Sequence, residues 1–178
     1  MQNLFNVLLI LIGLAVALFV ALVVLHPNAT PSPEVQDTKN QALIPQEIEG
    51  FSVERIDRVD PIFDGELFSV HASFAPTADS SFQGLVENLG ITLFILEHTR
   101  AADEIKPLLL MGDSGELTLE GMHIQSFLNP DARLAGLLWQ DGVKLYYVLV
   151  AGVDSGDLNM NALQQAAQAA AKAILRRK

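Results

Sequence analysis

The residues of this chain that could bind a metal are three histidines and two methionines. Imidazole and thioether groups are ligands for copper and zinc. Known sites space their ligands closely, for example as H-x-x-x-H on a helix, and no such pair occurs here. The chain also has no cysteine, which excludes the C-x-x-C-H attachment of haem. We therefore predict no metal and no cofactor at these residues, which are His71, His98, Met111, Met122 and His123.

Nucleophilic and phosphate-binding motifs are also missing from the sequence. The motif G-x-S-x-G does not occur, and Gly112-Asp113-Ser114-Gly115 fits a loop between a helix and a strand. There is no glycine-rich phosphate loop and no calcium-loop pattern. In so acidic a chain, neighbouring carboxylates such as Glu47 and Glu49 are expected on solvated surfaces. We predict that the protein is not an enzyme.

Three aromatic residues stand on two neighbouring strand-like segments: Tyr146 and Tyr147 are the candidates for contact with a partner, whereas packing is favoured for Trp139. Trp139 precedes the tight turn Asp141-Gly142, and Tyr146 and Tyr147 follow it. Cross-strand aromatic pairs stabilise sheets, and aromatic residues are also common at binding hot spots. Successive residues of a strand point to opposite faces. We therefore expect one tyrosine in the core and the other in contact with solvent or a partner.

A long apolar segment, Leu4–Leu25, contains no charged residue. As a helix it would be roughly 33 Å long, enough to cross a hydrocarbon core of about 30 Å. A cleaved signal peptide would have a basic start, a shorter apolar run and a cleavage site. A lipoprotein would need a cysteine, and a buried core helix is rarely apolar on all faces. We predict an uncleaved, single-pass transmembrane anchor over residues 1–25.

The anchor suggests a location and a packing face. We expect a cytoplasmic N-terminus in a cell inner membrane and an extracytoplasmic, periplasmic domain; the absence of cysteine is compatible with an oxidising compartment. Gly13, Ala17 and Ala21 recur every four residues, and this small-xxx-small spacing lets two helices approach closely in lipid. Glycine and alanine are also frequent in membrane helices in general. The predicted partners are the lipid bilayer and other membrane protein subunits.

Charge and composition bound the rest of the chain. There are 21 acidic and 11 basic residues, which gives a formal net charge of −10. Nucleic acid is therefore excluded as a partner, because phosphate binding depends on clustered Lys and Arg. The proline-rich residues 26–44 favour an extended linker. Residues 45–178 are long enough for one domain with one core.

The hydropathy pattern of residues 45–178 predicts a series of strands and three helices. Alternating or continuous apolar runs predict strands over 51–57, 67–74, 91–97, 116–119, 122–128, 134–140 and 144–153. Capping and stop signals predict a short helix over 79–90 and another over 100–111, with Thr99 as its N-cap and Pro107 as a kink. Asp141-Gly142 is a strong hairpin signal.

The clearest helix prediction lies at the C-terminus. Seven apolar residues recur at helical spacing and form one continuous stripe, which we expect to pack on the sheet: Leu163, Ala166, Ala167, Ala170, Ala171, Ile174 and Leu175. Helices mixed with hairpin-linked strands predict an α+β fold. In this fold a mainly antiparallel sheet is packed by helices, after one N-terminal transmembrane helix.

A family resemblance rests on about a third of the chain. The run from Gly121 through Leu138-Trp139-Gln140-Asp141-Gly142 and Tyr146-Tyr147-Val148-Leu149-Val150 to the helix at 163–170 resembles the uncharacterised C-terminal extracytoplasmic domain of single-pass anti-sigma-factor-like bacterial envelope proteins. The pattern is a strand, a strand with a tryptophan, a tight turn, a tyrosine-rich strand and a closing helix. The resemblance implies this fold and an envelope location. Its motifs contain no reactive residue.

Two functions are therefore expected. The first is a non-catalytic accessory or structural subunit, which docks on a larger membrane protein complex through its anchor and its extracytoplasmic domain. The alternative is a free-standing envelope sensor or ligand-binding protein, as the resemblance would imply.

Overall fold

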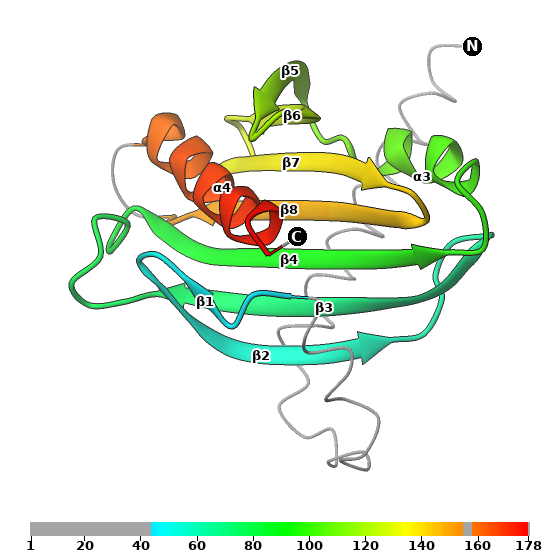
Figure 1. Ribbon diagram of the computed structural model, residues 1–178. Helices are drawn as coiled ribbons and strands as arrows, with labels where there is room; N and C mark the ends of the chain where they lie inside the picture. Colours follow the sequence, from blue (N-terminus) through cyan, green and yellow to red (C-terminus); the bar gives the residue numbers. More distant parts are fainter. Residues whose placement is uncertain (1–43, 155–157, 178) are drawn as a thin grey trace. The chain divides into compact units, whose positions relative to one another are not determined.

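The computed structural model describes residues 44–154 and 158–177. Within these residues the chain forms eight strands and two helices, labelled as in Figure 1. In chain order they are β1 (Glu47–Ile48), β2 (Phe51–Val59), β3 (Glu66–Pro76), β4 (Val86–Leu96), α3 (Ala101–Leu109), β5 (Asp113–Leu119), β6 (Met122–Asn129), β7 (Leu134–Asp141), β8 (Lys144–Gly152) and α4 (Met160–Leu175). The strand predictions are confirmed within a few residues, except that β4 begins five residues earlier.

All eight strands form one antiparallel sheet in the order β1-β2-β3-β4-β8-β7-β6-β5. The sheet consists of two meanders, β1 to β4 and β5 to β8, and the pairing of β4 with β8 joins them. The chain passes from β4 through α3 to β5 at the far edge, and then returns strand by strand to the centre (Figure 1). The predicted hairpin at Asp141-Gly142 is confirmed, since Asp141 pairs with Lys144.

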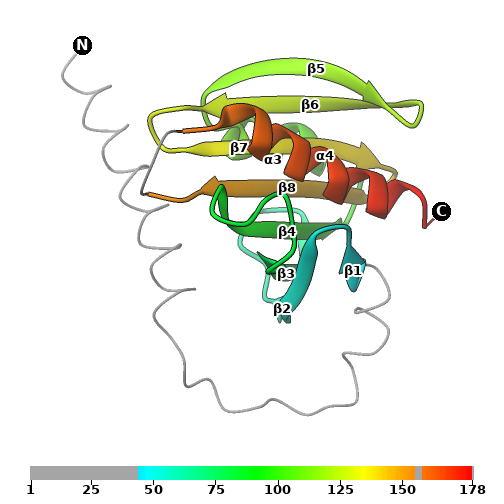
Figure 2. The ribbon, with the colours of Figure 1, turned by 90° about the vertical axis from the view of Figure 1, so that its left-hand side faces the viewer.

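The sheet is strongly twisted. In Figure 1 the strands β2, β3 and β4 run across the view, while β5 and β6 are foreshortened. After the rotation to Figure 2 it is β5 and β6 that run across the view. This twist follows from the right-handed twist of each strand. Because of this twist, α4 crosses the strands at an angle and lies mainly over β7, β8 and β4.

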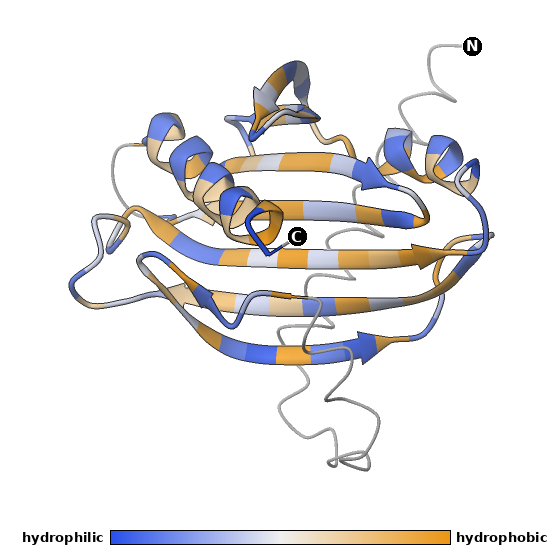
Figure 3. Cartoon of the chain, in the orientation of Figure 1, coloured by the Kyte–Doolittle hydropathy of each residue, from blue (hydrophilic) through white to orange (hydrophobic). Residues whose placement is uncertain are grey.

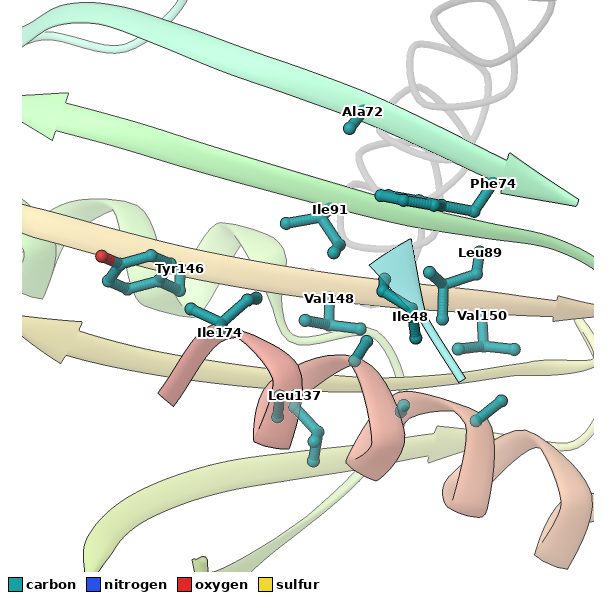
Figure 4. Packing of buried hydrophobic residues seen from close by; sticks show 14 of the residues in the cluster. Ile48, Ala72, Phe74, Leu89, Ile91, Leu137, Tyr146, Val148, Val150 and Ile174 are labelled. Atoms are coloured by element: carbon teal, nitrogen blue, oxygen red, sulfur yellow. The ribbon is translucent and has the colours of Figure 1, made fainter. Parts of the chain in front are cut away.

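Helix α4 covers one face of the sheet. Its start is capped by Asn159, whose side-chain oxygen accepts a hydrogen bond from the Ala162 N–H at 3.0 Å. Its sheet-facing side consists mostly of alanine, so the helix lies close over β7, β8 and β4, where Leu137, Val148 and Val150 point toward it (Figure 4). The predicted apolar stripe is confirmed: Leu163, Ala166, Ala167, Ala170, Ala171 and Ile174 are all buried.

Helix α3 covers part of the opposite face. A second apolar cluster forms there between the buried side of α3 and four strands. The strand residues of this cluster are Phe94, Leu96, Phe127, Leu138, Leu145 and Tyr147. Thus the central strands have apolar side chains on both sides, which explains the apolar second half of β4 and the apolar run of β8 (Figure 3).

The predicted α+β fold class is wrong, because the sheet dominates the domain. Strands make up half of the described residues and helices about a fifth. The helix predicted over 79–90 does not form: residues 80–85 make a turn, and β4 begins at Val86. Gly90, interpreted as a helix stop, lies inside β4 opposite Ser73 and Leu149. A Cβ there would lie 3.4 Å from the imidazole of His71, an ordinary van der Waals contact, so Gly90 is a regular strand position.

The predicted single-pass membrane architecture also needs correction. The segment Leu4–Leu25 lies outside the described residues. Among the described residues neither helix is long and apolar enough to cross a membrane; α4, with 16 residues, would span about 24 Å against a hydrocarbon core of about 30 Å. On this finding the transmembrane architecture and the inner-membrane location are withdrawn.

Candidate docking surface at one end of the sheet

Tyr146, the first of the two candidate contact residues, lies in the core of the α4 face. It is only 5% exposed, and its ring stacks on that of Trp139 with the centroids 5.0 Å apart. Ile174 of α4 lies beside it (Figure 4). Burial raises the pKa of the Tyr146 phenol, and the nearby charge of Asp141 raises it further. Its role in this structure is to pack a cross-strand aromatic pair.

Tyr147 lies on the opposite face and is also buried, at 7% exposure. Its ring stacks on Phe127, with the centroids 5.9 Å apart. Gly136 leaves the space for Phe127, because a Cβ there would lie 2.2 Å from the phenylalanine ring. The Tyr147 hydroxyl has no hydrogen-bond partner, and burial raises its pKa.

The expectation that one tyrosine faces solvent is therefore wrong. A helix packs on each face of the sheet, and both rings lie in apolar clusters. The sequence contains no local signal that α3 would pack against the second face. The other candidate contact residues, Gly13, Ala17 and Ala21, lie outside the described residues.

The three histidines considered as metal ligands lie in separate places and make separate contacts. On β3, the Nδ1 atom of His71 lies 3.0 Å from the Thr92 hydroxyl. The Nδ1 atom of His98 accepts a hydrogen bond from the Ala101 N–H at 3.1 Å, and so satisfies the start of α3 in place of the predicted cap Thr99. His123 is exposed on β6. Among the described residues, no three histidine or acidic side chains are grouped so that they could hold a metal.

His71 is the most electrostatically perturbed of these residues. Burial lowers the pKa of its imidazole, an effect opposed by the negative charge of Asp57 and reinforced by the positive charge of Arg55. Asp57 stands opposite His71 on β2 and forms an ion pair with Arg55. The three groups and Thr92 make a polar row on the face that α3 partly covers.

Exposed apolar side chains gather at the end of the sheet where β2, β4 and β7 end. Ile62, in the loop between β2 and β3, is 53% exposed, Leu67 of β3 is 50% exposed, and Val143, in the turn between β7 and β8, is 42% exposed. The end of β4 links their segments: the Leu96 N–H donates to the Val143 carbonyl, and the Glu97 N–H donates to the Gly65 carbonyl, both at 2.9 Å. We call Ile62, Leu67 and Val143 the apolar end.

The loop that carries Ile62 is held by a buried carboxylate. One oxygen of Glu66 accepts hydrogen bonds from the Ile62 N–H at 3.0 Å and the Phe63 N–H at 3.1 Å. The ring of Phe63 packs edge-on against Phe94, with the centroids 5.8 Å apart. Gly65 adopts a positive φ of 75° beside Ala101 of α3, a conformation and an approach that favour glycine. Ile62 is thus presented on a fixed backbone.

The turn that carries Val143 is held by a glutamine. The amide nitrogen of Gln140 donates to the Thr99 carbonyl at 2.8 Å and to the Gly142 carbonyl at 3.0 Å. Its amide oxygen accepts a hydrogen bond from Nζ of Lys106 on α3 at 2.8 Å. These contacts tie the hairpin, the residues after β4 and α3 together. Both exposed apolar segments are therefore fixed in place before any partner binds.

Carboxylates surround this apolar end. Asp60 and Asp64 flank Ile62 in the sequence, and Glu97 follows β4; all three are exposed. Arg58, Arg100 and Lys144 are the cations nearest in the sequence to these residues, and the Arg58 guanidinium lies over the Phe68 ring, 4.3 Å from its centroid. The acidic rim agrees with the net charge of the chain.

A hollow lies at the other end of the sheet. It has a volume of about 420 Å³ and is lined by the β1–β2 turn, the loop after β3 and Ala169 of α4. Its polar lining includes Glu49, Thr77, Asp79 and Ser80. The Ser80 hydroxyl already accepts the Phe82 N–H. The hollow contains no histidine or cation, and we assign it no chemistry.

Comparison of the sequence with known protein families and with curated proteins gives no match. The structure is similar to the crystal structure of a GTP binding regulator (TM1622) from Thermotoga maritima, with a TM-score of 0.41 and 15% sequence identity. The similarity covers 79% of this chain and 90% of that chain. At this TM-score and identity it supports no functional argument.

Proposed function

We propose that this protein is a non-catalytic accessory subunit whose folded domain docks on a partner protein through the apolar end. The observation that carries the proposal is the exposure of Ile62, Leu67 and Val143 on segments that hydrogen bonds hold in place. A rigid surface loses little conformational entropy on binding, so exposed apolar side chains on it can contribute most of their burial energy.

The acidic rim defines the partner further. Asp60, Asp64 and Glu97 would steer a basic surface toward the apolar end and would disfavour an acidic one. The fitting partner is a protein that presents an apolar contact surrounded by Lys or Arg. Such an arrangement, with an apolar centre and a polar rim, is typical of specific protein interfaces.

Photo-crosslinking in the cells that produce the protein tests this proposal. A photoreactive amino acid replaces Ile62 in the full chain or, as a matched control, Val53, which is 39% exposed near the opposite end of β2. We expect position 62 to give a discrete adduct with one other protein, identified by mass spectrometry, and position 53 to give none.

Two further variants make the test specific. Val143→Asp, on the neighbouring turn, should reduce the adduct from position 62, because the charge would disrupt the same contact. Circular dichroism should show that this turn variant keeps its fold. The proposal fails if both positions give the same adducts, or if the adduct from position 62 is insensitive to Val143→Asp.

A further inference from the structure

A second surface lies at the edge of the sheet that β5 forms. Among the described residues, β6 is the only strand beside β5, so the outward backbone groups of β5 have no strand partner there. The pairing with β6 runs from Asp113 opposite Leu128 to Leu119 opposite Met122 without a register shift. A regular open edge of this kind is a template for another strand.

The opposite edge shows how this protein protects a strand. There β1 covers the start of β2 at Phe51 and Ser52. A register shift between Val53 and Arg55 interrupts the ladder with β3. Arg55 and Arg58 place two cations on β2, which is mostly hydrophilic along its length (Figure 3). Bulges and charged side chains of this type discourage edge-to-edge pairing.

Strand β5 lacks the bulge and the basic side chains that protect β2. Residues 113–119 contain no Lys, Arg or Pro, and their register is continuous. Leu117 and Leu119 pack partly against the core on the α4 face and keep some exposure. They continue an apolar strip that begins with Met122 and Leu128 on β6.

The side chains of β5 indicate which strand would fit. Asp113 and Glu116 are exposed, and no cation of the described residues lies within ion-pair distance of either. An added strand with alternating apolar and basic residues would extend the leucine strip on one face and pair with Glu116 on the other. A second copy of β5 fits poorly, since antiparallel pairing with full overlap would bring Glu116 against Glu116.

We propose that β5 binds an extended basic segment of a partner protein as an additional, ninth strand of the sheet. Backbone hydrogen bonds would supply the affinity, and the alternating side chains would supply the selectivity. This surface is separate from the apolar end and does not depend on the function proposed for it. It lies along the outer strand of the second meander, whereas Ile62 and Leu67 belong to the first.

A short synthetic peptide of alternating lysine and valine, with blocked ends, is the probe. Binding to the full chain is followed by hydrogen exchange, which reports on individual segments. We expect the β5 amides to become protected while those of β2 do not change. Glu116→Lys should weaken binding about fivefold, the effect of replacing one cross-strand attraction by a repulsion. The matched variant Glu54→Lys on β2 should bind like the wild type.

A backbone-modified peptide separates strand addition from simple charge attraction. The same peptide, methylated on alternate backbone nitrogens along the edge that faces β5, keeps its charges but cannot donate hydrogen bonds to that strand. It should not protect the β5 amides. Equal binding of the methylated peptide, protection on β2 instead, or no protection of β5 at millimolar peptide would each overturn the proposal.

Discussion

The two faces of the sheet are covered in different ways. On the α4 face, alanines bring a helix backbone close to Leu137, Val148 and Val150, so that small side chains on the helix meet large ones on the strands. On the α3 face, the large side chains belong to the sheet itself: Phe127 lies over Gly136 and stacks on Tyr147. Packing on the α4 face therefore depends on small side chains on the helix, whereas packing on the α3 face depends on the missing side chain of Gly136 on β7.

A charge under α4 should have the largest effect. Ala170 is fully buried in the middle of the apolar stripe, so Ala170→Asp would place an unpaired carboxylate against the strands. The cost, about several kcal/mol, is comparable to the whole stability of a small domain. Thermal unfolding followed by circular dichroism should lose its cooperative transition. Gln165→Asp, on the exposed side of the same helix, is the control and should keep it.

Adding a methyl group on the α3 face should have the next largest effect. In Gly136→Ala the new Cβ would lie 2.2 Å from the Phe127 ring and 2.6 Å from the Val148 carbonyl oxygen. Overpacking of this kind costs about 1–3 kcal/mol, measurable by urea denaturation. Gly115→Ala, whose Cβ would be 3.3 Å from the Ser126 hydroxyl, should cost less.

A double variant sharpens the interpretation of Gly136. If the ring of Phe127 causes the strain, Phe127→Leu should cost less in the Gly136→Ala background than in the wild type. Strictly additive free energies of unfolding would instead place the strain at the backbone of β8.

Removing the hydroxyl of Tyr147 should have a small effect on stability, and unlike the changes above it should not destabilise the fold. This buried group has no hydrogen-bond partner. Tyr147→Phe therefore removes a polar atom that folding desolvates without compensation, and we expect stability to stay unchanged or to rise by about 1 kcal/mol. Urea denaturation is again the measurement. A loss of more than about 1 kcal/mol would indicate a hydrogen bond to this hydroxyl.

The smallest expected effect concerns pH and the polar row on the α3 face. Because burial lowers the pKa of His71 below its ordinary 6.5, the unfolded chain binds a proton more readily than the folded one. The contribution of neutral His71 to the free energy of unfolding is therefore complete above pH 6.5 and is lost as the pH falls toward the folded-state pKa. His71→Gln should reduce the loss of stability between about pH 7.5 and about pH 5.5. His123→Gln, at an exposed position of β6, is the matched substitution for comparison.

Local signals identified part of this fold from the sequence. Helix α4 follows from its stripe, and the β7–β8 hairpin follows from alternation around Asp141-Gly142, because both signals lie within a few neighbouring residues. Gly90 and Tyr147 were misassigned for a different reason. The place of Gly90 inside β4 depends on the pairing of that strand with β3 and β8, and the burial of Tyr147 depends on where α3 packs. Neither contact has a signature in its own segment.

The candidate sites show the same limit. The apolar end combines Ile62 with Val143, which are far apart in the chain, and the end of β4 bonds to the segments that carry them. The open edge of β5 depends on the strand order, which no property of residues 113–119 determines. Exposed apolar residues and edge strands could be recognised only after the sheet had been assembled.

The strand order has a further consequence for how the chain reaches its fold during synthesis. Strand β4 is complete early, but its partner β8 follows roughly fifty residues later, as the pairing of Leu93 with Tyr146 shows. Until β8 has been synthesised, the apolar edge of β4 lacks the strand with which it pairs. Closing this long-range pair joins the two meanders, and pairings of such high sequence separation form slowly. A nascent chain that pauses before Lys144 would therefore expose the apolar edge of β4, and residues 44–143 would lack the pairing that joins the two meanders.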